Sequence, residues 1–180
     1  MPAALCDLVV AKGIVRVIPA SASQLDGTVR AIRACISKMH SLGIDQWDEE
    51  YPDRETVSTA IDNQTLHLIE QAGSVVVGAG LDTEQPPEYR LCAWHCGSPA
   101  LVVHHLFVHP DHWRNGYASH FMNFVEKHAK SSGLASVRLD AYAGNPAALS
   151  LYQARGYSEV GEVTFPRRLL KFKCFEKPVE

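Results

Sequence analysis

The sequence contains no long hydrophobic run, and no stretch approaches the roughly 20 apolar residues that a membrane-spanning helix requires. It also lacks the positive leading region of a signal peptide, and Asp7, Lys12 and Arg16 interrupt its fairly apolar N-terminus. An excess of positive charge is missing too, since seventeen basic and twenty acidic side chains give a net charge of -3. We therefore expect a cytoplasmic protein that binds neither a membrane nor nucleic acid.

A disulfide framework is not expected either, because the cysteines are odd in number and scattered. The five are Cys6, Cys35, Cys92, Cys96 and Cys174. We expect no bound metal, since the Cys92 and Cys96 pair lacks a second pair at zinc-site spacing. The adjacent His104 and His105 would also point to opposite faces of a strand. No repeat, low-complexity tract or linker divides the 180 residues, so residues 1–180 are expected to form one domain.

Hydrophobic periodicity predicts the order of helices and strands. Helices are expected at 24–42, 54–62, 117–131 and 146–154, and strands at 13–18, 65–70, 74–81, 101–108, 136–142, 156–163 and 170–177, with a further strand starting within 92–96. A strand, a helix and a strand follow one another from 101 to 142, so the two strands should be parallel. The predicted class is α/β of the α+β kind: a mixed, largely antiparallel central sheet with helices on both faces and one parallel β-α-β crossover.

The most distinctive segment is the turn between the apolar strand 101–108 and the helix 117–131. The helix opens at Gly116 and the small residue Ala118, and the first amides of a helix have no internal partner. Such amides, together with the helix dipole and the charge of Arg114, would bind an anion, and we expect a pyrophosphate. The alternative is an ordinary strand-to-helix turn. Neither GxxxxGK[ST] nor a post-strand GxGxxG is present.

Two motifs in the right order resemble the GNAT superfamily of acyltransferases over about Leu101–Val163. In the first, [Q/R]-x-x-G-x-[G/A], Gly116 and Ala118 match and Trp113 replaces the usual Gln or Arg. The second motif comprises Asn145, Ala148, Tyr152, Gly156 and Tyr157. The resemblance implies transfer of an acetyl group from acetyl-CoA to a primary amine of a small molecule or peptide, by direct attack in a ternary complex. The alternative is a catalytically inactive acyl-CoA sensor with the same fold. The resemblance also makes a homodimer plausible.

The resemblance further implies which residues hold acetyl-CoA. The expected cofactor residues are Leu106, Phe107 and Val108 on a splayed strand, Arg114, Asn115, Gly116, Tyr117, Ala118 and Ser119 in the turn, and Asn145 and Tyr152 in the second motif. Tyr152 is the expected acid that protonates the leaving thiolate.

His104 is the candidate base, because related enzymes carry a His or Glu two places before the residue equivalent to Leu106, and histidine titrates near neutrality. His105 is its reserve, and a water relay remains open. Strict alternation would put Val102, His104 and Leu106 on one face, and Val103, His105 and Phe107 on the other. The predicted acceptor site comprises Trp47, Asp48, Glu84 and Tyr142, with Asp140 as a further candidate.

Overall fold

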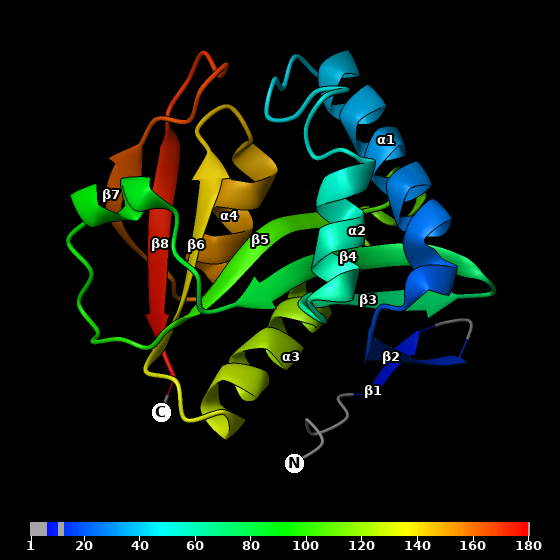
Figure 1. The fold of residues 1–180 in the computed structure, drawn as a ribbon, viewed down its shortest axis with the longest axis horizontal. Helices are drawn as coiled ribbons and strands as arrows, with labels where there is room; N and C mark the ends of the chain where they lie inside the picture. Colours follow the sequence, from blue (N-terminus) through cyan, green and yellow to red (C-terminus); the bar gives the residue numbers. More distant parts are fainter. Residues whose placement is uncertain (1–6, 11–12, 180) are drawn as a thin grey trace.

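The computed structural model describes residues 7–10 and 13–179, so Cys6 lies outside the described residues. Eight strands form one sheet in the order β1-β2-β3-β4-β5-β6-β8-β7 (Figure 1). The strands are β1 (Asp7–Val10), β2 (Gly13–Pro19), β3 (Leu66–Gln71), β4 (Ser74–Asp82), β5 (Leu101–Val108), β6 (Ser136–Tyr142), β7 (Ser158–Val163) and β8 (Phe172–Pro178). The helices are α1 (Leu25–Ser41), α2 (Arg54–Asp62), α3 (Tyr117–Ser131) and α4 (Pro146–Ala154), with short 3-10 turns at η1 (Ala22–Gln24), η2 (Pro87–Leu91) and η3 (Pro110–His112).

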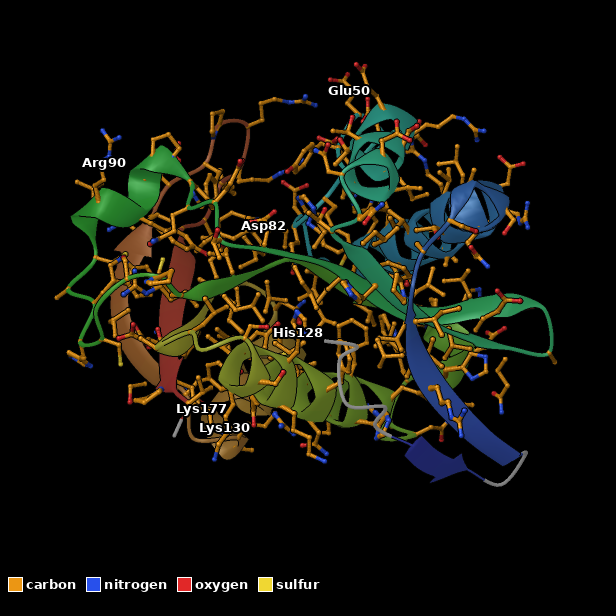
Figure 2. The ribbon with its side chains drawn as sticks, turned by 60° about the horizontal axis from the view of Figure 1, so that its bottom comes forward. Glu50, Asp82, Arg90, His128, Lys130 and Lys177 are labelled. Carbon is orange, nitrogen blue, oxygen red and sulfur yellow. The ribbon has the colours of Figure 1, made fainter. Side chains whose placement is uncertain are left out.

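Helices cover both faces of the sheet. On one face, α1 and α2 bury an apolar stripe that includes Ile32 and Val57 against Leu68 of β3. On the other face, α3 and α4 pack Phe121 and Tyr152 into a second core. Figure 2 shows the layers from the side, with Glu50 and Asp82 on the α2 side and His128 and Lys130 on α3. The expected sheet with helices on both faces is therefore confirmed.

The predicted crossover is also confirmed, because β5 and β6 are parallel neighbours joined through α3. Their pairing is short: only Leu101 with Val137 and Val102 with Arg138 are in register. Beyond Val102 the two strands diverge, so β5 has no β6 partner along its second half. Every other strand pair in the sheet is antiparallel.

The expected alternation along β5 is wrong beyond His104. A bulge shifts the register between β4 and β5, and His105 adopts a φ of 54°. One extra residue in a strand moves all later side chains to the other face. Leu106 therefore packs with the α3 core, and Phe107 joins the α1–α2 core. The rings of His104 and His105 lie 6.3 Å apart, on the same side of the sheet.

The strand expected within 92–96 is also wrong. This segment forms no strand, and the backbone amides of His95 and Cys96 donate to Oε2 of Glu176, at 2.7 and 3.1 Å. Oε1 of the same carboxylate accepts from Arg138 Nε at 2.9 Å. Arg138 also donates to the Cys96 carbonyl oxygen at 2.6 Å and stacks on the ring of Trp94. The buried Arg138–Glu176 ion pair therefore anchors this loop beside the start of β6 and the end of β8.

Candidate active site

The divergence of β5 from β6 opens a cavity of about 1390 Å³, which we call the main cavity. Its walls come from the loop between α1 and α2, the second half of β5, the N-terminus of α3, the end of β6, α4 and the loop between β7 and β8. The sequence motifs of the turn and of α4 therefore meet in one cavity, although a helix and a strand separate them along the chain.

The turn before α3 presents free backbone amides to the main cavity. Gly116 begins the helix with a φ of 81°, a left-handed conformation that glycine adopts without steric cost. The amide of His120 bonds back to the Gly116 carbonyl at 3.0 Å, so the amides of the first turn have no helical partner. Those of Ala118 and Ser119 belong to cavity-lining residues. Amides and a dipole of this sign suit a pyrophosphate, and Arg114 lines the same wall.

Three residues of this turn differ in how they are placed. Tyr117 directs its buried ring into the core, where its hydroxyl donates to Gln71 at 2.8 Å, although the residue also borders the main cavity. Asn115 is not among the residues that line the main cavity. The indole nitrogen of Trp113, at the place of the usual Gln or Arg, donates to the Val108 carbonyl at 2.7 Å. Trp113 thus ties the turn to the end of β5.

The second half of β5 lines the main cavity through Leu106, Phe107 and Val108. On its β4 side the strand is paired, for example Phe107 with Gly78. On its β6 side no pairing continues past Val102, so backbone groups on that edge have no strand partner. Exposed strand edges form hydrogen bonds with extended ligands. This edge therefore suits an amide-bearing arm such as pantetheine.

Tyr152 lies on α4 with its side chain 5% exposed, and it lines the main cavity. Its ring packs against Tyr157 and Phe175. The hydroxyl of Tyr152 forms no hydrogen bond with any of the described residues, whereas the hydroxyl of Tyr117 donates to Gln71. Burial, and then the charge of Asp140, raise the pKa of Tyr152 above that of an ordinary tyrosine, so the hydroxyl stays protonated.

His104 and His105 both line the main cavity but have different partners. The Nε2 atom of His104 lies 3.0 Å from Oδ1 of Asp82, at the end of β4. His105 shares a hydrogen bond with the hydroxyl of Tyr51. Burial, and then the neighbouring His104, lower the pKa of His105 to about 4, so it is neutral at pH 7. His104 therefore has an orienting carboxylate, and His105 does not.

Asp140, near the end of β6, is one of two carboxylates that line the main cavity, and the other is Glu50. The hydroxyl of Tyr89 donates to its Oδ2 at 2.8 Å. Burial raises its pKa to about 6, although the Tyr89 hydrogen bond and His104 oppose the shift. Its charge in turn raises the pKa values of Tyr51 and Tyr152. Asp140 is thus electrostatically coupled to three cavity groups, which its place in the sequence pattern did not reveal.

The predicted acceptor residues do not come together. Trp47 is buried in the wall of the main cavity, with its ring 6.1 Å from that of His105. Glu84 lines a smaller neighbouring cavity instead. Tyr142 packs against Phe172 and lines neither cavity. Asn145 caps α4, and its Nδ2 donates to Gln46 at 2.8 Å, so its side chain joins α4 to the loop between α1 and α2.

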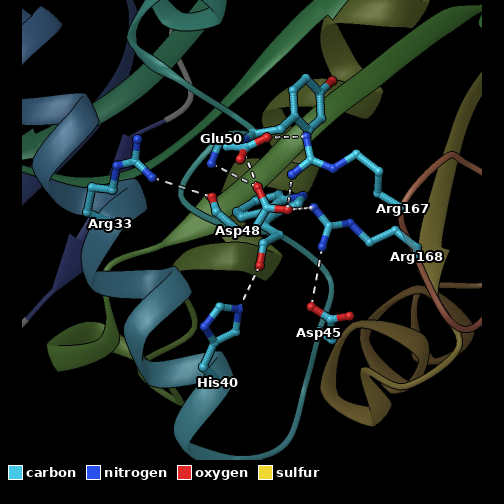
Figure 3. A network of polar contacts seen from close by, with 9 residues as sticks. Arg33, His40, Asp45, Asp48, Glu50, Arg167 and Arg168 are labelled. Atoms are coloured by element: carbon cyan, nitrogen blue, oxygen red, sulfur yellow. Dashed lines mark hydrogen bonds and ion pairs between the residues drawn. The ribbon is translucent and has the colours of Figure 1, made fainter.

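Asp48 also lines neither cavity, because arginines of the loop between β7 and β8 engage its carboxylate (Figure 3). Oδ2 of Asp48 accepts from Arg167 at 2.9 Å and from Arg168 at 2.7 Å. Arg168 continues to Asp45, and Arg167 to Glu50. We call this ionic cluster the arginine bridge. It joins the loop between α1 and α2 to the loop between β7 and β8, and both loops line the main cavity.

Two further properties concern the described residues only. No three His, Cys, Asp or Glu side chains among them are grouped so that they could hold a metal ion. In the same part of the chain, none of the helices has both the length and the apolar character needed to span a bilayer.

Comparison with known proteins gives one family and many structures. The model of the Acetyltransferase (GNAT) family matches residues 32–157. A curated relative, aminoglycoside N(6')-acetyltransferase type 1 of Acinetobacter genomosp. 13, is 32% identical over 105 residues, which are 54% of this chain and 72% of the relative.

Solved structures share the fold at lower identity. A GNAT-family acetyltransferase of Streptococcus agalactiae superposes with a TM-score of 0.81 at 18% identity, covering 96% of this chain and 99% of that one. The Salmonella typhimurium protein yncA, solved with its cofactor acetyl-CoA, gives 0.66 at 13% identity, with coverage of 92% and 94%. The family match, with the anion-binding turn and the diverging strands that the fold provides, shows that this chain belongs to the GNAT family and is an acyl-CoA-dependent N-acetyltransferase.

Proposed function

We propose that the protein transfers an acetyl group from acetyl-CoA to a primary amine of a small molecule, by direct attack while both substrates are bound, and that the chain works as one catalytic domain. The supporting observation is that the anion-binding turn, the free edge of β5, Tyr152 and His104 all line the main cavity. Two substrates held in one cavity can react without a covalent enzyme intermediate. Acetyl-CoA supplies the activated thioester.

In this proposal the acceptor enters from the side of Trp47, and Asp140 binds its ammonium group. A carboxylate whose pKa is about 6 is mostly ionised at pH 7.5 and can pair with a cation. His104 then receives the proton that the amine must lose. With Nε2 directed at Asp82, the Nδ1 atom of His104 is left to accept it, and Asp82 stabilises the resulting imidazolium.

Tyr152 acts at the other end of the reaction by donating its hydroxyl proton to the leaving sulfur. Its raised pKa keeps that proton on the hydroxyl in the resting enzyme, and the leaving thiolate takes it as the carbon–sulfur bond breaks. The unpaired amides along β5 supply donors for charge that develops on the carbonyl oxygen. The residues thus cover the three requirements of acetyl transfer from a thioester to an amine.

Thiol release from acetyl-CoA, measured with a panel of primary amines, tests the proposal. We include an aminoglycoside, because the curated relative is an aminoglycoside N(6')-acetyltransferase. An amine-dependent release with formation of the acetylated amine is expected. Thiol release that no amine accelerates would contradict the proposal and favour the acyl-CoA sensor instead. The comparisons give no support for that alternative.

Two alanine variants separate the candidate bases. His104→Ala should lower kcat by about 10²–10⁴-fold, the usual contribution of a general base. His105→Ala is its matched control, because it removes a neighbouring imidazole that faces the same side of the sheet. We expect the control to change kcat by less than about tenfold. The reverse pattern would transfer the role to His105, and an unchanged kcat in both would favour a water relay.

A further inference from the structure

A second cavity, of about 440 Å³, lies next to the main cavity between α1, α2 and the strands β3, β4 and β5. We call it the α2 cleft. It shares His104, His105 and Phe107 with the main cavity, so one pair of imidazoles borders both spaces. The proposed base thus stands at the boundary between the reaction site and the α2 cleft.

The α2 cleft is strongly acidic. Its lining residues include four carboxylates, Asp53, Glu55, Asp82 and Glu84, and neither lysine nor arginine. Asp82 is engaged by His104, and Asp53 accepts from the amide and hydroxyl of Thr56. Within residues 7–10 and 13–179, neither Glu55 nor Glu84 forms an ion pair. Unpaired carboxylates around a concave surface attract cations.

A second, independent feature of the α2 cleft is a buried hydroxyl without a hydrogen-bond partner. Thr28 lines it from α1, and its side chain is 0% exposed. Its Oγ1 has no hydrogen-bond partner among the described residues. A buried polar group without a partner costs free energy, and native proteins rarely leave one unsatisfied. A hydroxyl oxygen accepts a hydrogen bond from an ammonium group, which would satisfy Thr28 and neutralise the carboxylates together.

We propose that the α2 cleft binds a second ammonium group of the acceptor, so that the natural acceptor is a polycationic amine with at least two amino groups. This inference rests on the proposed function, because it places the reacting amine at Asp140 and His104 in the main cavity. Linear polyamines and amino sugars share this chemistry. Glu55, Glu84 and Thr28 would then select against amines with a single positive charge.

Matched substrates test the requirement for a second charge. The values of kcat/KM are compared for 1,4-diaminobutane and 1-aminobutane, which have the same carbon chain, and for spermidine and kanamycin. We expect the diamine to exceed the monoamine by about tenfold or more, as expected for a hydrogen-bonded charge. The larger value among spermidine and kanamycin identifies the linear or the sugar source. Equal values for diamine and monoamine would overturn the inference.

Variants then locate the second charge. Glu55→Gln should lower kcat/KM for 1,4-diaminobutane by about threefold, because this carboxylate is exposed, and Thr28→Val by about tenfold. Both variants should leave kcat/KM for 1-aminobutane unchanged. Valine keeps the shape of threonine, so the Thr28 variant should fold. Asp62→Asn is the matched control, since it removes a carboxylate of α2 that does not line the cleft, and it should change neither substrate.

Direct binding separates a failure of this inference from a failure of the proposed function. If no amine is acetylated, the proposed function is wrong, and calorimetry with spermidine becomes the decisive measurement. Binding that weakens in Glu55→Gln and Thr28→Val but not in Asp62→Asn would still support the α2 cleft as a polyamine site. Absence of binding, or equal binding by all four proteins, would overturn it.

Discussion

The two ends of the β5–β6 pair differ in how completely their polar groups are paired. We call the end where Leu101 and Val102 pair with β6 the lower end, and the end where the strands diverge the upper end. At the lower end the strands are in register, and the buried Arg138–Glu176 pair has hydrogen-bond partners for both charged groups. At the upper end the strands diverge, Asp140 is half-buried with a raised pKa, and Tyr152 keeps a hydroxyl free. The difference indicates that fully paired polar groups fix the sheet at one end, whereas Asp140, which lacks a counter-charge, and the free hydroxyl of Tyr152 at the other end are available to substrates.

The largest effect is expected at the upper end, from Tyr152→Phe. The change removes one oxygen and keeps the ring, so acetyl-CoA binding should be nearly unchanged while kcat falls by about 10²–10⁴-fold, or about 3–5 kcal/mol. Tyr157→Phe is a matched control, because Tyr157 contacts the Tyr152 ring but does not line the main cavity. Full activity of Tyr152→Phe in a steady-state assay would assign its hydroxyl a structural role.

At the lower end, Glu176→Gln should cost about 3–5 kcal/mol of the free energy of unfolding, because it leaves Arg138 buried without a counter-charge. Urea unfolding measures this loss, and kcat of the folded variant should change little. Glu162→Gln is the control, since it breaks an ion pair with Lys171 whose side chains are 42% and 62% exposed. That loss should stay below about 1 kcal/mol. Equal losses in both variants would break the comparison.

Asp140→Asn should stabilise the protein, in contrast to the change at Glu176. A carboxyl whose pKa is raised to about 6 binds its proton more tightly in the folded state, so its contribution to stability falls as pH rises from about 4 to 6. Asparagine avoids this loss and can still accept from Tyr89. The variant should gain about 1–2 kcal/mol at pH 5 and about 3 kcal/mol at pH 7.

Urea unfolding of both proteins across this pH range tests the stabilisation. If the difference in unfolding free energy between the two proteins does not widen with pH, the ionised form of Asp140 does not destabilise the fold. The same variant should raise KM for the amine by about tenfold, because a charged hydrogen bond to the ammonium is lost.

The smallest effect concerns the anion-binding turn. Gly116→Asp places a negative charge at the N-terminus of α3, where we expect the amides to bind the pyrophosphate of CoA, and should weaken CoA binding by about tenfold. Gly133→Asp controls for backbone strain, because Gly133 follows the other end of the same helix with a φ of 71° and has equally open surroundings. Calorimetry should find CoA affinity unchanged in that control. Similar weakening in both would mean that strain, and not charge, acts at Gly116.

Much of the fold could be predicted because local patterns agreed with tertiary packing. The predicted bounds of α2, α3, α4, β5 and β6 match the structure. The N-terminal strand β1 was missed, and the segment 92–96 was assigned a strand that it does not form. In that segment a carboxylate from β8 satisfies the backbone amides, and such a distant partner leaves no periodic signal nearby.

The site could be predicted only in part, for a similar reason. The turn at Gly116 and the motif around Tyr152 are local patterns that were visible in the sequence, and both line the main cavity. The importance of Asp140 depends on burial and on Tyr89, which is 51 residues earlier in the chain. The engagement of Asp48 depends on Arg167 and Arg168, which follow it by about 120 residues. Sequence spacing could suggest an acidic acceptor loop, but not which carboxylates were already paired.

The bulge at His105 has a consequence for how this gene tolerates change in length. Because one additional residue sets which side chains of β5 face each helix layer, deleting a single codon there would restore regular alternation. Leu106, Phe107 and Val108 would then keep their present layers, with the Phe107 ring still on Gly78, and only the His105 imidazole would be lost. Position 105 should accept asparagine or glycine, which adopt positive φ readily. In a library selected for folded protein, deletion of residue 105 should therefore be recovered, whereas single-residue deletions elsewhere along this strand should be eliminated.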